Sequence, residues 1–282
     1  LEREAGILGT FPSHHVDALA GRLRHEGVTI QTDVRISGVE AIHSGVRITT
    51  RDGVALEAER LLVAAGRVAN TDGLGLESAG VKLDGDILDV DRSCRTRSGH
   101  VYGIGDVATR TRFTHTAGAM ARTAVLRALF KVPGSFDERS MPAVVYTDPA
   151  IGCVGRREGT GGAAKVRQVH VSMDRVDRSL VTGAPTGEIR LRVSRWGRIR
   201  GADVLGANAG EIIGMISALI GTGAGIRRLS GTVLPYPTYS EGLGRAASKA
   251  IARSVPDRLV RLAARAAGLR GEHAGFDPDS IG

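Results

Sequence analysis

The feature that most constrains this chain is the stretch from His100 to Phe130, where a short extended segment runs directly into an alanine-rich helix. Small and β-branched side chains alternate up to Ile104, and Gly105 and Asp106 then end the predicted strand. Beyond Thr116 the apolar residues recur at helical spacing. Such a corner sets a carboxylate beside the free backbone N–H groups of a helix start, which can bind a polyol and a phosphate together. The alternative is an ordinary connection in which Asp106 only caps the helix.

A chain of 282 residues predicts about two domains, since domains usually hold ~100–200 residues each. Hydrophobic residues make up 42% and charged residues 24%, which is typical of a globular protein, while 39 glycines suit tight turns and close approach of the backbone to cofactors. No apolar run reaches the ~18 residues that predict a membrane span. The net charge of +8 is spread along the sequence and aromatic residues are only 4%, so we expect an anionic cofactor and no nucleic acid.

The two cysteines, Cys94 and Cys153, are too few and too far apart for a zinc site, a CxxC centre or a disulfide framework. We therefore expect no metal site and a cytoplasmic location, where thiols stay reduced. Cys153 lies in the apolar segment AIGCVG and is interpreted as a core residue, whereas Cys94 lies in a polar turn and is interpreted as incidental.

Five segments carry a resemblance to a known family. VYGIGD followed by THTAGAMARTAVLRAL resembles the second flavin-binding motif of the two-dinucleotide-fold flavoprotein disulfide reductases, which include dihydrolipoamide dehydrogenase, glutathione reductase and mercuric reductase. Four more segments resemble further family motifs in the family's order: LLVAAGRVANTDGLGL, MPAVVYTDPAIGCVG, GADVLGANAGEIIGMI and PYPTYSEGL. The resemblance covers roughly residues 1 to 250. It implies a homodimeric enzyme that passes hydride from NAD(P)H through FAD to a disulfide or another small-molecule electron acceptor.

The implied architecture is α/β and α+β, with partial nucleotide-binding, Rossmann-like domains followed by an α+β dimerisation domain. We expect the C-terminal part of an NAD(P)-binding domain at residues 1–68 and the returning segment of an FAD-binding domain at residues 69–138. The dimerisation domain then covers residues 139–253, and a basic tail covers residues 254–282.

Periodicity predicts the elements of these domains. The expected helices, besides the one after Thr116, are His14–Glu26, Ala209–Ile220 and Glu241–Arg253. The expected strands are VTIQTDVRISGVEAI, GVRITTR and VALEAERLLVAAG in the first part, and AVVYTDP, VRQVHVSM, EIRLRVSR and GADVLGA in the dimerisation domain, with a turn at SRWGR. The family often has a helix at the segment GTGGAAKVR, but its glycines disfavour one here.

The resemblance places the flavin at the opening corner. It implies that Asp106, next to Gly105, binds the ribityl or neighbouring hydroxyl groups of FAD. It also implies that Thr114, His115 and Ala117 lie under the pyrimidine end of the flavin. No proton-transfer partner for His115 is evident in the sequence, so the alternative for that residue is a cap or packing group at the helix start.

The resemblance places the nicotinamide nucleotide near the start of the chain. Glu2 falls where the family has the acid that holds an adenosine ribose through its 2′-hydroxyl, which favours NAD over NADP, although the neighbouring Arg3 leaves both open. Val34 is assigned to the same group of cofactor-binding positions. Gly66 lets the backbone pass close to a ligand, and Arg67 can reach a phosphate or a carboxylate.

Two family features are missing from this sequence. No strand runs into a GxGxxG loop, and no CxxxxC pair is present. We expect the chain to be a C-terminal fragment that is inactive alone and does not hold FAD tightly, because the glycine loop would supply the N–H donors for the pyrophosphate. The alternative is a non-catalytic dimerising remnant without redox-active cysteines.

The segment PYPTYSEGL departs from the family at its ionisable position. Disulfide reductases carry a His-Glu pair spaced five apart here, whereas this chain has Tyr236 and Glu241. A phenol titrates near pKa ~10 and is a weak base at neutral pH, while an imidazole titrates near ~6.5. We assign Tyr236 and Glu241 as the catalytic pair, with Tyr236 serving an acceptor other than an ordinary disulfide. The alternative is that Tyr236 only packs at the subunit interface.

The tail begins as a basic amphipathic helix, in which Leu259, Leu262 and Leu269 alternate with arginines. Such a helix can touch an anionic membrane surface, but the tail lacks the bulky aromatic residues that anchor one there. The favoured interpretation is a solvated helix on the dimerisation domain, followed by a disordered end.

Overall fold

The computed structural model describes residues 1–156 and 166–267. They form two compact units, of which the first combines Leu1–Arg35 with the residues from Pro142 onward and the second is Ile36–Met141. Most of the segment GTGGAAKVR and the end of the tail lie outside the described residues. Among the described helices, none is long and apolar enough to cross a membrane.

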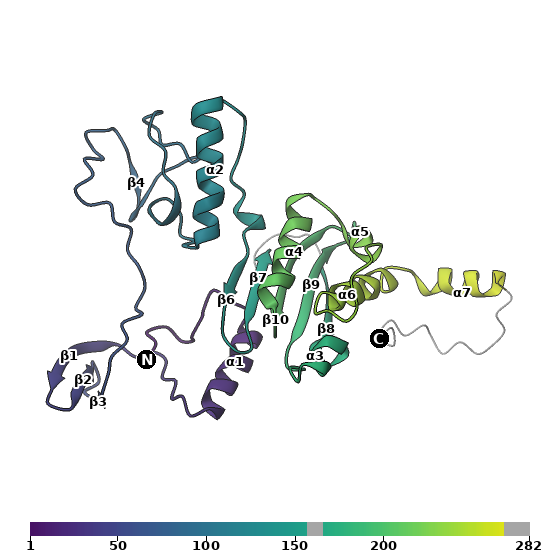
Figure 1. The fold of residues 1–282 in the computed structure, drawn as a ribbon, viewed down its shortest axis with the longest axis horizontal. Coiled ribbons are helices and arrows are strands. Elements are labelled where there is room, and N and C mark those ends of the chain that lie inside the picture. Colours follow the sequence, from purple (N-terminus) through teal and green to yellow (C-terminus); the bar gives the residue numbers. More distant parts are fainter. Residues whose placement is uncertain (157–165, 268–282) are drawn as a thin grey trace. The chain divides into compact units, whose positions relative to one another are not determined.

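A five-stranded antiparallel sheet organises the first unit (Figure 1). In spatial order its strands are β6 (Ala143–Val145), β7 (Ile151–Gly155), β10 (Ile199–Leu205), β9 (Glu188–Ser194) and β8 (Val166–Ser172). The four strands predicted for this region are confirmed, and so is the turn between β9 and β10. Strand β7 was not predicted, because the run around Cys153 has only apolar character and no alternation.

Helices cover one face of this sheet. They are α3 (Asp177–Val181), α4 (Ala209–Gly221), α5 (Ile226–Ser230) and α6 (Glu241–Ala252), with the 3-10 turn η3 (Met173–Arg175) before α3. Helix α7 (Asp257–Ala266) follows α6 and does not lie on the sheet in Figure 1. Figure 1 shows α4 along β7 and β10. Ile213 packs so close to β7 that a Cβ on Gly152 would lie 2.7 Å from its side chain. The predicted helices at 209–220 and 241–253 are confirmed.

The opposite face of the sheet packs against α1 (Ser13–His25), which confirms the helix predicted at 14–26. Val16 and Leu19 of α1 form a buried cluster with Ile151 of β7 and Leu205 of β10. Successive side chains of a strand point to opposite faces, so Leu205 faces α1 while its neighbour Val204 joins the core under the other helices.

The second unit holds a three-stranded antiparallel sheet of β1 (Ile36–Ile42), β2 (Gly45–Thr50) and β3 (Ala55–Ala58). The strands predicted at 28–42 and 54–66 are confirmed only over β1 and β3, and their predicted extension to residues 28–35 and 59–66 is wrong. Leu62 and Val63 are 87% and 76% exposed, because no described strand lies beside them to pair with their backbone. Apolar composition alone therefore overstated the extent of the sheet.

The remaining part of this unit contains the hairpin β4 (Leu83–Asp84) and β5 (Ile87–Leu88), the 3-10 turns η1 (Gly105–Val107) and η2 (Glu138–Ser140), and helix α2 (Thr114–Phe130). Leu88, Cys94 and Met120 belong to its buried core. The helix is confirmed and starts two residues before Thr116. The predicted strand before Gly105 is reduced to an isolated bridge between Arg95 and Tyr102, since its other edge has no partner among the described residues.

Candidate functional site

The corner between η1 and α2 is built around an ion pair. The Arg67 Nη1 atom lies 2.8 Å from Asp106 Oδ2, and Arg67 Nη2 donates to the backbone carbonyl of Arg112 at 2.5 Å. The side chains of Arg67 and Asp106 are 61% and 43% exposed, so a ligand can still reach them. The structure thus brings together two predicted cofactor-binding residues that lie 39 positions apart in the sequence.

Gly105 allows the corner to approach α2. It has φ +70°, and a Cβ added there would lie 3.2 Å from the Cβ of Ala117. Helix α2 has Phe113 at its N-cap position, with no side-chain hydrogen bond to the helix end. Asp106 lies within η1 and does not cap α2. The alternative that this carboxylate only caps the helix is therefore excluded.

The start of α2 presents the other residues assigned to the flavin. Thr114 and His115 are exposed, and Ala117 is partly buried with its N–H donating to the Phe113 carbonyl at 3.1 Å. The ring of His115 stacks on Phe113 with centroids 5.2 Å apart and planes 10° apart. A flat aromatic surface therefore stands at the helix start, and His115 has a packing partner there.

Glu2 and Val34 are brought together by the backbone of the other unit. The Val34 N–H donates to the Glu2 carbonyl at 2.9 Å, and the Glu2 N–H donates to the Gln31 carbonyl at 2.8 Å. The Glu2 carboxylate accepts a hydrogen bond from the backbone N–H of Glu4 at 2.9 Å. This local contact orients the carboxylate through one of its two oxygens.

Tyr236 is the end of a hydrogen-bonded network in the dimerisation domain. Its hydroxyl donates to Asp177 Oδ2 at 2.7 Å, and its side chain is 70% exposed. The other oxygen of Asp177 lies 3.5 Å from Arg245 Nη2, which also donates to Glu241 Oε1 at 2.7 Å. Tyr236 and Glu241 are thus linked through Asp177 and Arg245, and the direct partner of the phenol is Asp177.

The hydrogen bond to the Asp177 carboxylate raises the pKa of Tyr236 above its ordinary value. The phenol therefore keeps its proton at neutral pH and turns its lone pairs away from Asp177. Glu241 Oε2 is buried without a hydrogen-bond partner, so this carboxylate is held from one side only. Sequence reasoning missed Asp177, which lies 59 positions from Tyr236, and it missed Arg245, which the helical i, i+4 spacing to Glu241 could have indicated.

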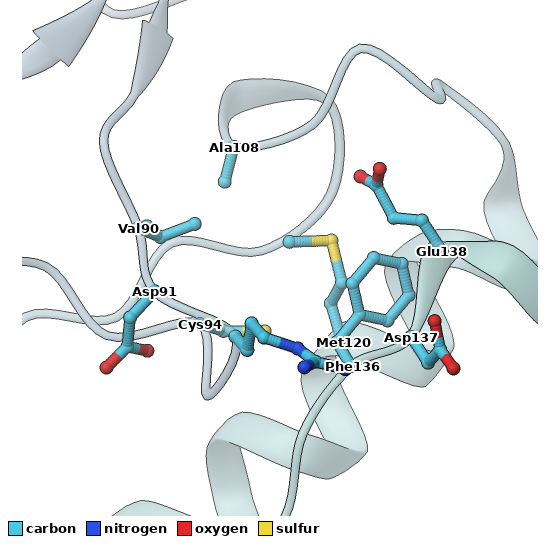
Figure 2. A pocket seen from close by; sticks show the side chains of 9 residues that line it. Val90, Asp91, Cys94, Ala108, Met120, Phe136, Asp137 and Glu138 are labelled. Atoms are coloured by element: carbon cyan, nitrogen blue, oxygen red, sulfur yellow. The ribbon is translucent and has the colours of Figure 1, made fainter. Parts of the chain in front are cut away.

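Each unit contains a cavity. A cavity of about 520 Å³ lies beside the Tyr236 loop, lined by Pro237 to Ser240 together with residues of α3 and α4. Figure 2 shows the other, of about 440 Å³, with Cys94, Met120 and Phe136 around it. Burial raises the pKa of the Cys94 thiol to about 11, which makes it unreactive. The residues assigned to the flavin do not line this second cavity.

Comparison with known proteins identifies the class. Residues 1–121 match the model of the pyridine nucleotide-disulphide oxidoreductases, and residues 141–247 match the dimerisation domain of the same family. The chain belongs to this family of oxidoreductases, in agreement with its mixed helix and sheet architecture. The resemblance found in the sequence is confirmed.

Individual relatives include a dehydrogenase and a reductase. The chain is similar to dihydrolipoyl dehydrogenase of Staphylococcus aureus, with 31% identity covering 89% of this chain and 55% of the relative. It is also similar to mercuric reductase of Streptomyces lividans, with 33% identity covering 79% of this chain and 49% of the relative. Among solved structures, LpdA of Mycobacterium tuberculosis gives a TM-score of 0.79 at 27% identity, covering 83% of this chain and 52% of that one. The chain spans about half the length of the relatives it matches.

Proposed function

We propose that these residues serve in a homodimeric, cytoplasmic FAD-dependent oxidoreductase that takes hydride from NAD(P)H and reduces a small-molecule acceptor. The observation that carries the proposal is the hydrogen bond of 2.7 Å between Tyr236 and Asp177, in the segment where family members carry the residue that serves the acceptor. In this proposal the 282 residues alone are inactive and hold FAD weakly. The alternative of a non-catalytic dimerising remnant predicts no turnover in any longer form.

The corner at Gly105 fits a flavin nucleotide. Its backbone approaches α2 because no Cβ is present, and the exposed Asp106 carboxylate keeps one oxygen to accept a hydroxyl while Arg67 neutralises its charge. In the proposal Asp106 orients the ribityl chain, and Thr114 and Ala117 set the position of the ring at the start of α2. FAD supplies hydride uptake and onward electron transfer when bound. On the nicotinamide side, Glu2 and Val34 are proposed to hold the ribose, which favours NAD, and Gly66 lets the chain pass close to the nucleotide.

Tyr236 is proposed to act on the acceptor. The Asp177 carboxylate accepts a hydrogen bond from the phenol, which increases electron density on the phenolic oxygen and directs its lone pairs toward the open side of the loop. An oxygen of this kind can coordinate a metal ion acceptor through these lone pairs, and the hydroxyl can donate its proton to a reduced acceptor only after it turns away from Asp177. A raised pKa makes the phenol unsuited to removing a proton from a thiol, so an ordinary disulfide is a poor substrate. Glu241 supports the arrangement through Arg245, which holds Asp177 in place.

The test separates the two half-reactions by stopped-flow spectroscopy in the flavin-loaded enzyme. We expect Tyr236→Phe to slow reoxidation of the reduced flavin by the acceptor at least tenfold, while flavin reduction by NAD(P)H stays unchanged. The acceptors are lipoamide, a benzoquinone and mercuric ion. A matched control is Tyr239→Phe, because the Tyr239 hydroxyl is hydrogen-bonded to Thr182 at 2.6 Å and lies three positions away on the same loop.

Two further variants sharpen this test. Asp177→Asn should reproduce part of the Tyr236→Phe effect and lower the pKa of Tyr236 toward ~10, measured by tyrosinate absorption with the Tyr236→Phe spectrum subtracted. Tyr236→His should shift activity toward small disulfides where redox cysteines are present. If Tyr236→Phe and Tyr239→Phe alter neither half-reaction with any acceptor, Tyr236 is a packing residue and the proposed acceptor role is wrong.

A further inference from the structure

Two histidines and one glutamate meet where α1 packs on the sheet. His14 and His15 lie in the first turn of α1, and Glu188 begins β9. Glu188 Oε1 lies 3.6 Å from His14 Nε2 and 3.3 Å from His15 Nε2, and the three ligand atoms all lie within 4.8 Å of one another. The sequence analysis singled out none of these residues, because 173 positions separate His15 from Glu188.

These separations match those of a small divalent cation site. In a tetrahedral zinc site with Zn–N bonds of ~2.0–2.1 Å, neighbouring ligand atoms lie about 3.3 Å apart. The two contacts to Glu188 are already close to that value, and the two imidazole nitrogens, which lie no more than 4.8 Å apart, must move closer to complete the set. Two imidazoles and one carboxylate are also the donor set of zinc sites that keep one position open.

Burial of the donor atoms favours a ligand between them. His15 is 1% exposed, and His14 Nε2 is buried without a hydrogen-bond partner. A buried polar atom of this kind is costly unless something binds it, and a metal ion would satisfy it. Packing of α1 through Leu19 and Ile151 holds the ligands on both sides in one compact unit.

The charges around the cluster are also compatible with a cation. Glu188 places its carboxylate beside the two imidazoles, where His15 and Arg190 are its hydrogen-bond partners. Arg190 donates to Glu188 Oε1 at 2.7 Å, and it can move to the second carboxylate oxygen when a metal takes the first.

We propose that His14, His15 and Glu188 form a binding site for one divalent transition metal ion, with zinc as the expected occupant, that joins α1 to β9. Cobalt shares the preference for tetrahedral nitrogen and oxygen ligands and serves as a spectroscopic probe. Magnesium and calcium prefer oxygen ligands and should not bind. The site is independent of the proposed flavin and acceptor chemistry, so its test does not depend on activity.

The first experiment titrates zinc chloride into the chelator-treated full chain by isothermal calorimetry. We expect one zinc ion per chain, a rise in melting temperature of about 5 °C at saturating zinc, and no response to magnesium. Cobalt should give the intense visible absorption bands of a tetrahedral complex. His14→Ala and Glu188→Gln should each weaken zinc binding at least tenfold, with circular dichroism showing that the fold is kept.

The matched control is His25→Ala, which removes an exposed histidine from the last turn of the same helix. This variant should bind zinc like the parent chain. The proposal is overturned if the parent chain binds no zinc below ~100 μM, or if the zinc bound is unaffected by both His14→Ala and Glu188→Gln. It is equally overturned if His25→Ala abolishes binding, since the metal would then sit elsewhere on α1.

Discussion

The buried ion pair between Arg192 and Asp203 gives the strongest test of how the dimerisation domain is held together. The two side chains are 3% and 2% exposed, and they face each other across β9 and β10. Arg192 donates from both terminal nitrogens to Asp203, with Nη2 lying 2.9 Å from Oδ1, and its Nε donates to the Arg156 carbonyl at 2.5 Å. Gly201 makes room for it, because a Cβ there would lie 2.9 Å from Arg192 Nη2.

The perturbation is Asp203→Leu, compared with the double variant Arg192→Leu/Asp203→Leu. The single change leaves a guanidinium buried without its counter-ion, which costs about 3–5 kcal/mol of unfolding free energy. The double change replaces both charges by apolar side chains, which is often close to neutral for a buried pair. A typical domain is stabilised by only ~5–15 kcal/mol, so the single variant loses a large share of its stability.

Urea denaturation followed by tryptophan fluorescence measures this difference. Trp196 is the only tryptophan of the chain and lies in the turn between β9 and β10, with Arg195 4.6 Å from its ring. With an m-value of about 2 kcal/mol/M, the midpoint of Asp203→Leu should fall by about 2 M. The exposed pair Arg22–Glu26 provides the control, since Arg22→Ala should change stability by less than ~0.5 kcal/mol. A single variant as stable as the parent, or a double variant as unstable as the single one, would refute this account.

Two other predictions concern the thiols and the assembly state. Because burial, aided by the Asp91 carboxylate, raises the pKa of Cys94 to about 11, its thiolate fraction should be on the order of 10⁻³ at pH 8, and Ellman's reagent should modify it only in denaturant or as the pH approaches 11. Modification of Cys94 in the native chain at pH 8 within minutes would contradict its burial. The chain should also sediment as a dimer at micromolar concentration through its dimerisation domain, and a well-folded monomer would contradict this expectation.

Sequence periodicity was sufficient to predict an element that carries its own amphipathic pattern. The helices α1, α2, α4 and α6 each repeat apolar residues at helical spacing, so the local pattern specified both their type and their extent. Strands need a partner as well as a pattern. The apolar runs that include Val63 and Ile104 were predicted to be strands. Neither forms a ladder, because no described strand lies beside either run to pair with it.

The candidate site also contains residues that local sequence predicts and residues that it does not. Gly105 and Tyr236 were found because local sequence fixes a tight corner and an unusual loop residue. The partners of these positions were not found, since Asp177 reaches Tyr236 only after the chain has folded. The ion pair of Arg67 with Asp106 joins two residues that were assigned separately, and their spacing in the sequence did not predict the contact.

The packing of α1 on strands from the far end of the chain has a consequence for biosynthesis. Helix α1 finds its partners only after β7, β9 and β10 have been made, and 173 residues separate His15 from Glu188. At ~5–20 residues per second, a ribosome needs on the order of 10–35 s to synthesise that interval. During this time Val16 and Leu19 face solvent on a nascent helix whose docking surface does not yet exist. Translation speed and chaperone occupancy therefore decide how long the apolar face of α1 stays vulnerable to aggregation.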